Sequence, residues 1–246
     1  MAWTVTARGA TEFSWGADGD VGDTFTPSEN DIICVAVTGT ADAALNAVTG
    51  WGATWYEVGT WQTAYPVVTL WAARMGASPG SSVVNVDITA STQVSCIVFQ
   101  IAGADTTATV EGVGAGKLFL QAQSTRQYNP SSPMSITALS SFGSSTNLSL
   151  TLCGIPANNA FTPQSGWTEA EQASLGTVAY NVAAMYKAAE DTSHTVEGDL
   201  FNWRYVTGVA LEMAEASSSP TTSLLQMLNH LRFSGNYFAI MLVLFL

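Results

Sequence analysis

The chain has 246 residues and a formal net charge of −12, from 7 Lys and Arg against 19 Asp and Glu. The few basic residues are scattered, whereas nucleic acids and anionic lipid surfaces are bound by clustered Lys and Arg. The composition therefore argues against a nucleic-acid partner and disfavours a membrane. Charged residues make up only 11% of the chain, so the polar surface has to come mainly from Ser, Thr, Asn, Gln and Gly.

Short runs of β-forming residues, separated by Gly, Pro, Asn and Ser, recur along the chain as far as residue 216. The predicted strands are residues 3–7, 31–38, 54–58, 67–75, 82–88, 94–102, 117–123, 134–139, 147–155, 176–187, 192–196 and 203–214. Many short strands of this kind predict an all-β protein built from jelly-roll or immunoglobulin-like β-sandwiches.

The second part of the chain repeats the pattern of the first. A shift of 116 residues places residues 31–37 over 147–153, and also places Gly50-Trp51 over Gly166-Trp167. Further along, a shift of 112 residues places 94–102 over 206–214, with the apolar residues of both segments in the same phase. Phase matters because a slip of one residue would turn every side chain to the other face of the sheet.

We therefore predict two tandem related β-sandwich halves, residues 1–113 and 114–216, followed by a short apolar tail, residues 217–246. The glycine-bearing stretch 111–117 lacks the spacing of a phosphate-binding loop. It is interpreted as the hinge between the two halves.

The tail begins with a Ser-, Pro- and Thr-rich linker and continues as a short amphipathic helix and a run of apolar residues. Its last ten residues are too few to cross a bilayer, which needs about 20. The alternatives are a last core element, docking on another subunit and membrane contact. The residues predicted to contact a partner subunit are Leu224, Leu228, Leu231, Tyr237, Phe238, Ile240, Leu242 and Leu244.

Residues that could carry out catalysis are sparse. The 2 histidines, His194 and His230, lie in neither a GxSxG nor an HExxH motif. Cys34, Cys96 and Cys153 each lie in an apolar run and are interpreted as small buried residues, with a Cys34–Cys96 disulfide as the alternative. We predict that the protein is not an enzyme and has no cofactor.

Asp18, Asp20 and Asp23 form the densest group of carboxylates in the sequence. Closely spaced Asp residues in a glycine-containing loop suit Ca²⁺, although the pattern does not match an EF-hand. The alternative is an ordinary solvated turn.

Aromatic residues are concentrated in residues 54–61. Alternation along a strand would place Trp55 and Trp61 on one face and Tyr56 on the other. Exposed rings of this kind stack on sugars, which makes the segment a candidate glycan site. The alternative is that the Trp side chains fill the core.

Several segments together resemble virion proteins of tailed bacteriophages. They are ThrProSerGluAsnAspIleIleCysValAlaVal (26–37), GlyTrp (50–51), ValThrLeuTrpAlaAla (68–73) and CysIleValPheGlnIleAlaGlyAlaAsp (96–105). The likeness covers most of residues 25–216 and is strongest in the first half. The second half departs from it, because Glu215 stands where the closing turn has Gly.

The resemblance implies a structural β-sandwich protein of a virion, of the head-decoration, tail or fibre type, without catalytic residues. The implied location is the extracellular particle, and the N-terminus carries no recognisable signal peptide. The implied partners are other virion subunits or further copies of this chain, and surface glycans are the alternative.

Overall fold

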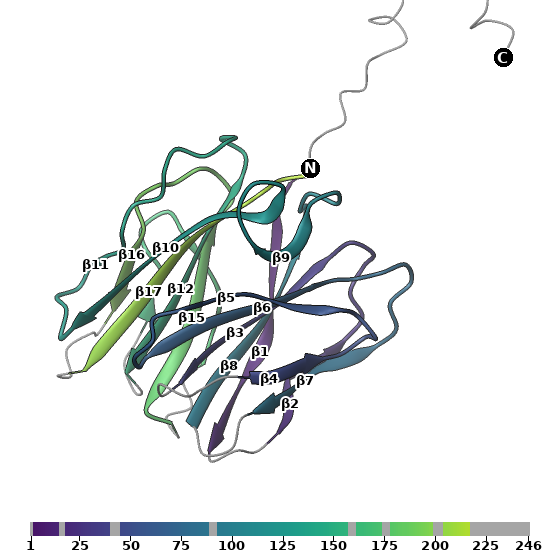
Figure 1. The fold of residues 1–246 in the computed structure, drawn as a ribbon, viewed down its shortest axis with the longest axis horizontal. Coiled ribbons are helices and arrows are strands. Elements are labelled where there is room, and N and C mark those ends of the chain that lie inside the picture. Colours follow the sequence, from purple (N-terminus) through teal and green to yellow (C-terminus); the bar gives the residue numbers. More distant parts are fainter. Residues whose placement is uncertain are drawn as a thin grey trace, which may run out of the picture. The chain divides into compact units, whose positions relative to one another are not determined.

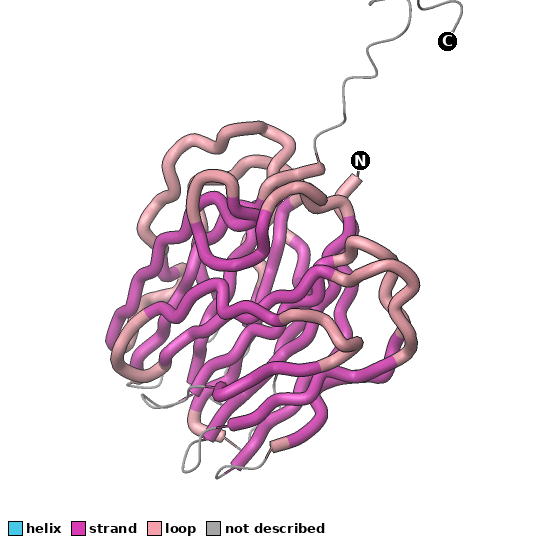
Figure 2. Tube along the Cα trace, turned by 45° about the vertical axis from the view of Figure 1, so that its right-hand side comes forward, coloured by secondary structure: helices cyan, strands magenta, loops and turns pink. Residues whose placement is uncertain are grey.

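The computed structural model describes residues 2–14, 18–39, 45–88, 93–156, 161–173, 178–198 and 204–216 (Figure 1). The chain divides into a compact unit of residues 1–216 and the segment 217–246. That segment lies outside the described residues, and so does the partner contact predicted for it. The described residues form strands and loops (Figure 2) and contain no helix that could cross a membrane.

The predicted all-β fold is confirmed, and strands occur in every segment where one was predicted. The strands are β1 (Thr4–Ser14), β2 (Gly19–Phe25), β3 (Ile32–Gly39), β4 (Leu45–Thr49), β5 (Trp55–Trp61), β6 (Val67–Arg74), β7 (Ser82–Ile88), β8 (Gln93–Ala102), β9 (Thr109–Val113), β10 (Lys117–Tyr128), β11 (Met134–Ser135), β12 (Leu148–Pro156), β13 (Phe161–Thr162), β14 (Thr168–Gln172), β15 (Tyr180–Lys187), β16 (Thr195–Gly198) and β17 (Tyr205–Met213). The sequence did not predict β2, β4, β9, β13 or β14.

Four sheets make up the unit of residues 1–216. The first large sheet has the order β1-β8-β3-β6-β5, and the second has the order β14-β15-β12-β17-β10-β9. Two small sheets, β2-β7-β4 and β11-β16-β13, accompany them. In Figure 1 the small sheet with β2, β4 and β7 lies on one side of the unit, and β11 and β16 lie on the opposite side.

Three apolar cores lie between these sheets. The central core joins the two large sheets, for example through Phe99 of the first and Leu211 of the second. The first outer core joins the first large sheet to β2-β7-β4, and the second outer core joins the second large sheet to β11-β16-β13. Each large sheet is therefore covered on both faces.

This burial explains why the middle strands β3 and β12 are almost continuously apolar. Every residue of both strands is buried, including Thr38 and Thr151. Antiparallel sheets usually expose one face to water and then alternate between apolar and polar residues. Here both faces meet a core, so alternation is lost.

The two large sheets share their strand order and much of their register. Read as β10-β17-β12-β15-β14, the second sheet follows the order β1-β8-β3-β6-β5 of the first. Ile32 of β3 pairs with Ile101 of β8, and Leu148 of β12 pairs with Met213 of β17. These pairs are related by the predicted shifts of 116 and 112 residues, while the common origin of the halves stays a prediction.

The register corrects the predicted repeat at the edge strands. Glu57 of β5 pairs with Trp71, and Glu169 of β14 pairs with Met185, with a bulge following in both strands. Two residues earlier, Trp55 therefore corresponds to Trp167. The predicted match between Trp51 and Trp167 is wrong, because a gap in the repeat already lies before β5.

A buried polar cluster recurs at corresponding positions of the two halves. In the first half, Gln100 donates a hydrogen bond to Asp31, and Arg8 donates one to Gln100 at 2.9 Å. In the second half, Asn147 donates to Glu212, and Gln121 also donates to Glu212, at 2.6 Å. The carboxylate is on β17 in the second half, whereas in the first half it lies just before β3.

The large sheets approach each other closely at Gly154. A Cβ atom at this position would lie 2.6 Å from Thr38 Oγ1 and 3.0 Å from Pro66 Cβ. Thr38 and Gly154 are related by the shift of 116 residues, so they are corresponding residues of β3 and β12. The missing side chain of one makes room for the other.

Replacing Gly154→Ala should lower the free energy of unfolding by about 1–3 kcal/mol, the usual cost of overpacking a core. Urea unfolding of the wild type and the variant measures this difference. Gly76→Ala is the matched control, since a Cβ at the exposed Gly76 would meet nothing within 4 Å. In the double variant Thr38→Ala/Gly154→Ala the loss should be smaller than the sum of the single losses, and equal stability of Gly154→Ala and wild type would contradict the close approach.

Candidate functional site

The predicted glycan site at Trp55, Tyr56 and Trp61 does not form a common face. The bulge between Glu57 and Gly59 inserts one residue and reverses the alternation of the strand. Trp55 consequently packs against the first outer core, and Trp61 packs against the central core. Both rings are partly buried, and only Tyr56 is exposed. The prediction that Trp55 and Trp61 share a face is wrong.

The predicted calcium site is not assembled either. Residues 19–25 form strand β2, which spreads the carboxylates of Asp18, Asp20 and Asp23 along its length. Asp18 Oδ1 accepts a hydrogen bond from the backbone N–H of Ile88 at 2.8 Å, and Asp20 Oδ1 accepts one from Asn85 at 3.1 Å. In the part of the chain that the structure describes, no group of three His, Cys, Asp or Glu residues could hold a metal ion.

The three cysteines are free and buried. Cys34 faces the central core, whereas Cys96 faces the first outer core, so their side chains lie on opposite faces of one sheet and form no disulfide. Burial raises the pKa of each thiol well above its ordinary value. These thiols stay protonated and pack as small apolar groups.

His194 is a buried structural residue. Its Nε2 lies 2.8 Å from the backbone oxygen of Asp191, and its Nδ1 lies 2.7 Å from Thr151 Oγ1. Since a carbonyl oxygen can only accept, Nε2 carries the proton and Nδ1 accepts from the Thr151 hydroxyl. The ring packs edge-on against Trp167. Burial lowers the pKa of His194 to about 4, and His230 lies outside the described residues.

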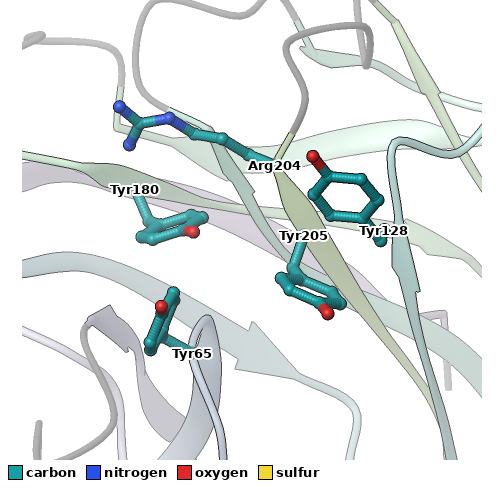
Figure 3. Close-up of a pocket in the computed structure, with 5 residues that line it drawn as sticks. All are labelled: Tyr65, Tyr128, Tyr180, Arg204 and Tyr205. Carbon is teal, nitrogen blue, oxygen red and sulfur yellow. The ribbon is translucent and has the colours of Figure 1, made fainter.

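A group of tyrosines that the sequence analysis did not single out lines an open cavity of about 270 Å³ (Figure 3). We call it the tyrosine–arginine cluster. Its members are Tyr65, Tyr128, Tyr180, Arg204 and Tyr205. Tyr65 belongs to the loop between β5 and β6 of the first half, and the other members belong to the second half, at the end of β10 and at the start of β15 and β17.

The four rings form two pairs, which Figure 3 shows on either side of the cavity. Tyr65 and Tyr180 have ring centroids 6.0 Å apart, and Tyr128 and Tyr205 have centroids 5.0 Å apart. Tyr65 is 47% exposed and Tyr128 is 53% exposed, whereas Tyr180 is buried. Each pair thus places an exposed ring on a less exposed one.

Arg126 fixes the loop of the first half to the second half. Its Nε and Nη2 donate to the backbone oxygen of Tyr65 at 2.9 and 2.8 Å, and its guanidinium carbon lies 3.4 Å from the centre of the Tyr205 ring. Next to it, Thr207 Oγ1 donates to the backbone oxygen of Pro66 at 2.7 Å. These bonds fix the backbone at Tyr65 and Pro66 relative to β10 and β17, and so position the Tyr65–Tyr180 pair beside the Tyr128–Tyr205 pair.

Arg204 is the cation of the cluster itself and is exposed. Its guanidinium carbon lies 5.9 Å from the centre of the Tyr180 ring. Burial raises the pKa of Tyr180, and the positive charges of Arg204 and Arg126 counteract part of that rise. Among the described residues that line the cavity, none is acidic. The arrangement can hold a ring-shaped ligand by stacking and offers it a positive charge.

Sequence reasoning missed this cluster because its members are far apart in the chain and follow no periodic pattern. The one usable signal is that Tyr128 and Tyr205 directly oppose each other across β10 and β17. The predicted strands 117–123 and 203–214 did not reveal this pair, because the first ended before Tyr128.

Comparison of the chain with family models, with curated proteins and with solved structures finds no match. The interpretation of the cluster therefore depends on its own geometry.

His194 should make the stability of the protein depend on pH. Its pKa falls from the ordinary 6.5 to about 4 on folding, so the unfolded chain takes up the proton first as the pH falls. The contribution is complete above pH 6.5 and is lost between pH 6.5 and 4, which amounts to roughly 3 kcal/mol.

Urea unfolding at pH 7.5 and 4.5 tests this for the wild type and for His194→Gln. The wild type should lose about 2–3 kcal/mol more than the variant over this range. Nearby groups such as Asp191 and Lys187 are present in both proteins and cancel in the comparison. The same pH dependence in both would show that His194 does not titrate in this way.

Proposed function

We propose that this chain is a non-enzymatic structural protein of a virion, of the head-decoration or tail-fibre type, and that it recognises a surface glycan through the tyrosine–arginine cluster. The observation that supports recognition is the pair of exposed rings, Tyr65 and Tyr128, at the rim of one cavity. The virion setting is supported by the resemblance of residues 25–216.

Tyrosine suits this role because its ring has an apolar face and a polar hydroxyl. It supplies a large contact area and loses little conformational entropy on binding, since it has only two side-chain torsions. The cavity of about 270 Å³ lies just below the usual range for small-molecule sites, roughly 300–1,000 Å³. A ligand of one or two sugar rings fits this size better than a long chain does.

The fold suits a particle protein because the second half is held firmly to the first. Across the central core the large sheets bury the faces that two separate sandwiches would expose. The tyrosine–arginine cluster lies where the loop of the first half is fastened to the second by Arg126 and Thr207. Ligand binding there needs both halves in place.

A glycan array tests the recognition site. The wild type should bind at least one class of glycan, and Tyr128→Ala should weaken that binding about tenfold or more, as for the loss of an aromatic anchor. Tyr56→Ala is the matched control, since Tyr56 is exposed but lies outside the cluster. No binding by the wild type would contradict the proposal, and equal loss in both variants would place the site elsewhere.

Co-sedimentation of the full chain with native particles tests the virion setting. We expect the chain to sediment with the particles and to give repeated density in electron microscopy of the assembly. Contacts between subunits, including those predicted for residues 217–246, would be visible in the same images. A stable monomer that stays in the supernatant would contradict the structural role, whatever the glycan array shows.

A further inference from the structure

We infer that the tyrosine–arginine cluster is selective for acidic saccharides and that Arg204 binds their carboxylate group. This inference rests on the proposed glycan recognition and assigns the class of ligand. The supporting observations are the charge of the cluster, the different environments of Arg204 and the neighbouring Arg126, and the residues at the corresponding positions of the first half.

The charge at the cluster is opposite to that of the chain. The whole protein carries −12 with only 7 basic residues, yet Arg204 lines this cavity and Arg126 lies against the Tyr205 ring beside it, and none of the described residues that line it is acidic. A cavity for a neutral sugar needs hydrogen-bonding groups but no net charge. A cation beside stacking rings instead matches a ligand that has both a ring and a negative group.

The two arginines differ in what they can still bind. The guanidinium of Arg126 is stacked on Tyr205 and donates twice to the Tyr65 carbonyl, so it acts as a positioning residue. Arg204 is exposed and makes a hydrogen bond of 3.4 Å to the backbone oxygen of Ala179, besides its interaction with the Tyr180 hydroxyl. A guanidinium has five N–H donors, which leaves Arg204 enough of them for a bidentate bond to a carboxylate.

Figure 3 shows where Arg204 lies relative to the tyrosine rings. Its side chain extends over the Tyr180 ring, while Tyr128 and Tyr205 lie on the other side of the cavity. In the inferred complex the sugar ring contacts the tyrosines and its carboxylate group binds the guanidinium of Arg204, which lies 5.9 Å from the centre of the Tyr180 ring. The aromatic rings bind the sugar ring of the ligand, and Arg204 binds its carboxylate group.

Two tyrosines of the cluster have no aromatic counterpart at the corresponding positions of the first half. The register that relates the large sheets puts Gln93 where the second half has Tyr205. It puts Pro66 where the second half has Tyr180. Gln93 Oε1 accepts a hydrogen bond from the backbone N–H of Ala179 at 3.2 Å, so this place is used for contact between the halves. The charged aromatic cavity therefore depends on positions at which the second half differs from the first, and not on the shared framework alone.

Matched pairs of acidic and neutral probes test the inference by isothermal titration of the full chain. The pairs are 3′-sialyllactose with lactose, and trigalacturonate with its methyl ester. The wild type should bind at least one acidic probe about tenfold or more tightly than its neutral partner, as expected for a hydrogen bond to a charged group. Arg204→Gln should remove this preference and leave binding of the neutral partner unchanged, and Arg204→Lys should restore it only in part.

Lys117→Gln is the matched control for loss of one positive charge, because Lys117 begins β10 and Tyr128 ends it. It should keep the preference of the wild type. Equal binding of acidic and neutral probes by the wild type would overturn the inference, and so would a preference that survives Arg204→Gln. If the array detects only neutral glycans, this inference fails while glycan recognition stands, and an array without any binding contradicts both.

Discussion

The structure depends on one constraint, which is that both faces of each large sheet are buried. The central core removes the inner faces from water, and the two small sheets cover the outer faces. Most antiparallel sheets bury one face only, so a single sandwich can fold around one core. Here each large sheet takes part in two cores, and neither can lose its partner without exposing a continuous apolar surface. This couples residues 1–113 and 114–216 into one compact unit.

The same constraint decides which elements the sequence could predict. Strands β3, β8, β12 and β17 are buried on both faces, so they appear as long apolar runs, and the register that relates them could be predicted from phase. The strands β2, β4, β13 and β14 lie at sheet edges, and β2, for example, is buried at only two of its positions. Such short, partly polar segments carry no periodic signal. A bulge in β5 then misled the prediction for Trp61, because alternation holds only for regular pairing.

The candidate site could not be predicted for a different reason. Each half supplies part of it, and its geometry exists only after the loop before β6 is fastened to β10 and β17. The order of residues along the chain does not reveal such contacts. The repeat gives an indirect indication of the site, because the cluster lies at positions where the second half differs from the first. The shared positions build the framework, and the departures, such as Tyr205 in place of Gln93, are where binding properties can arise without disturbing it.

The carboxylate and its amide partner occupy opposite positions in the polar clusters of the two halves. This difference affects which strands can pair during folding. Strands with similar apolar patterns in one chain can mispair, which is a characteristic failure of repeated sequences. If β17 took the place of β8 beside β3, the carboxylate of Glu212 would meet that of Asp31 in a buried environment. If β8 took the place of β17 beside β12, two amides would meet and the acidic partner of Asn147 would be lost. Like charges are costly to bury together. The positions of these side chains therefore favour pairing of each strand within its own sheet.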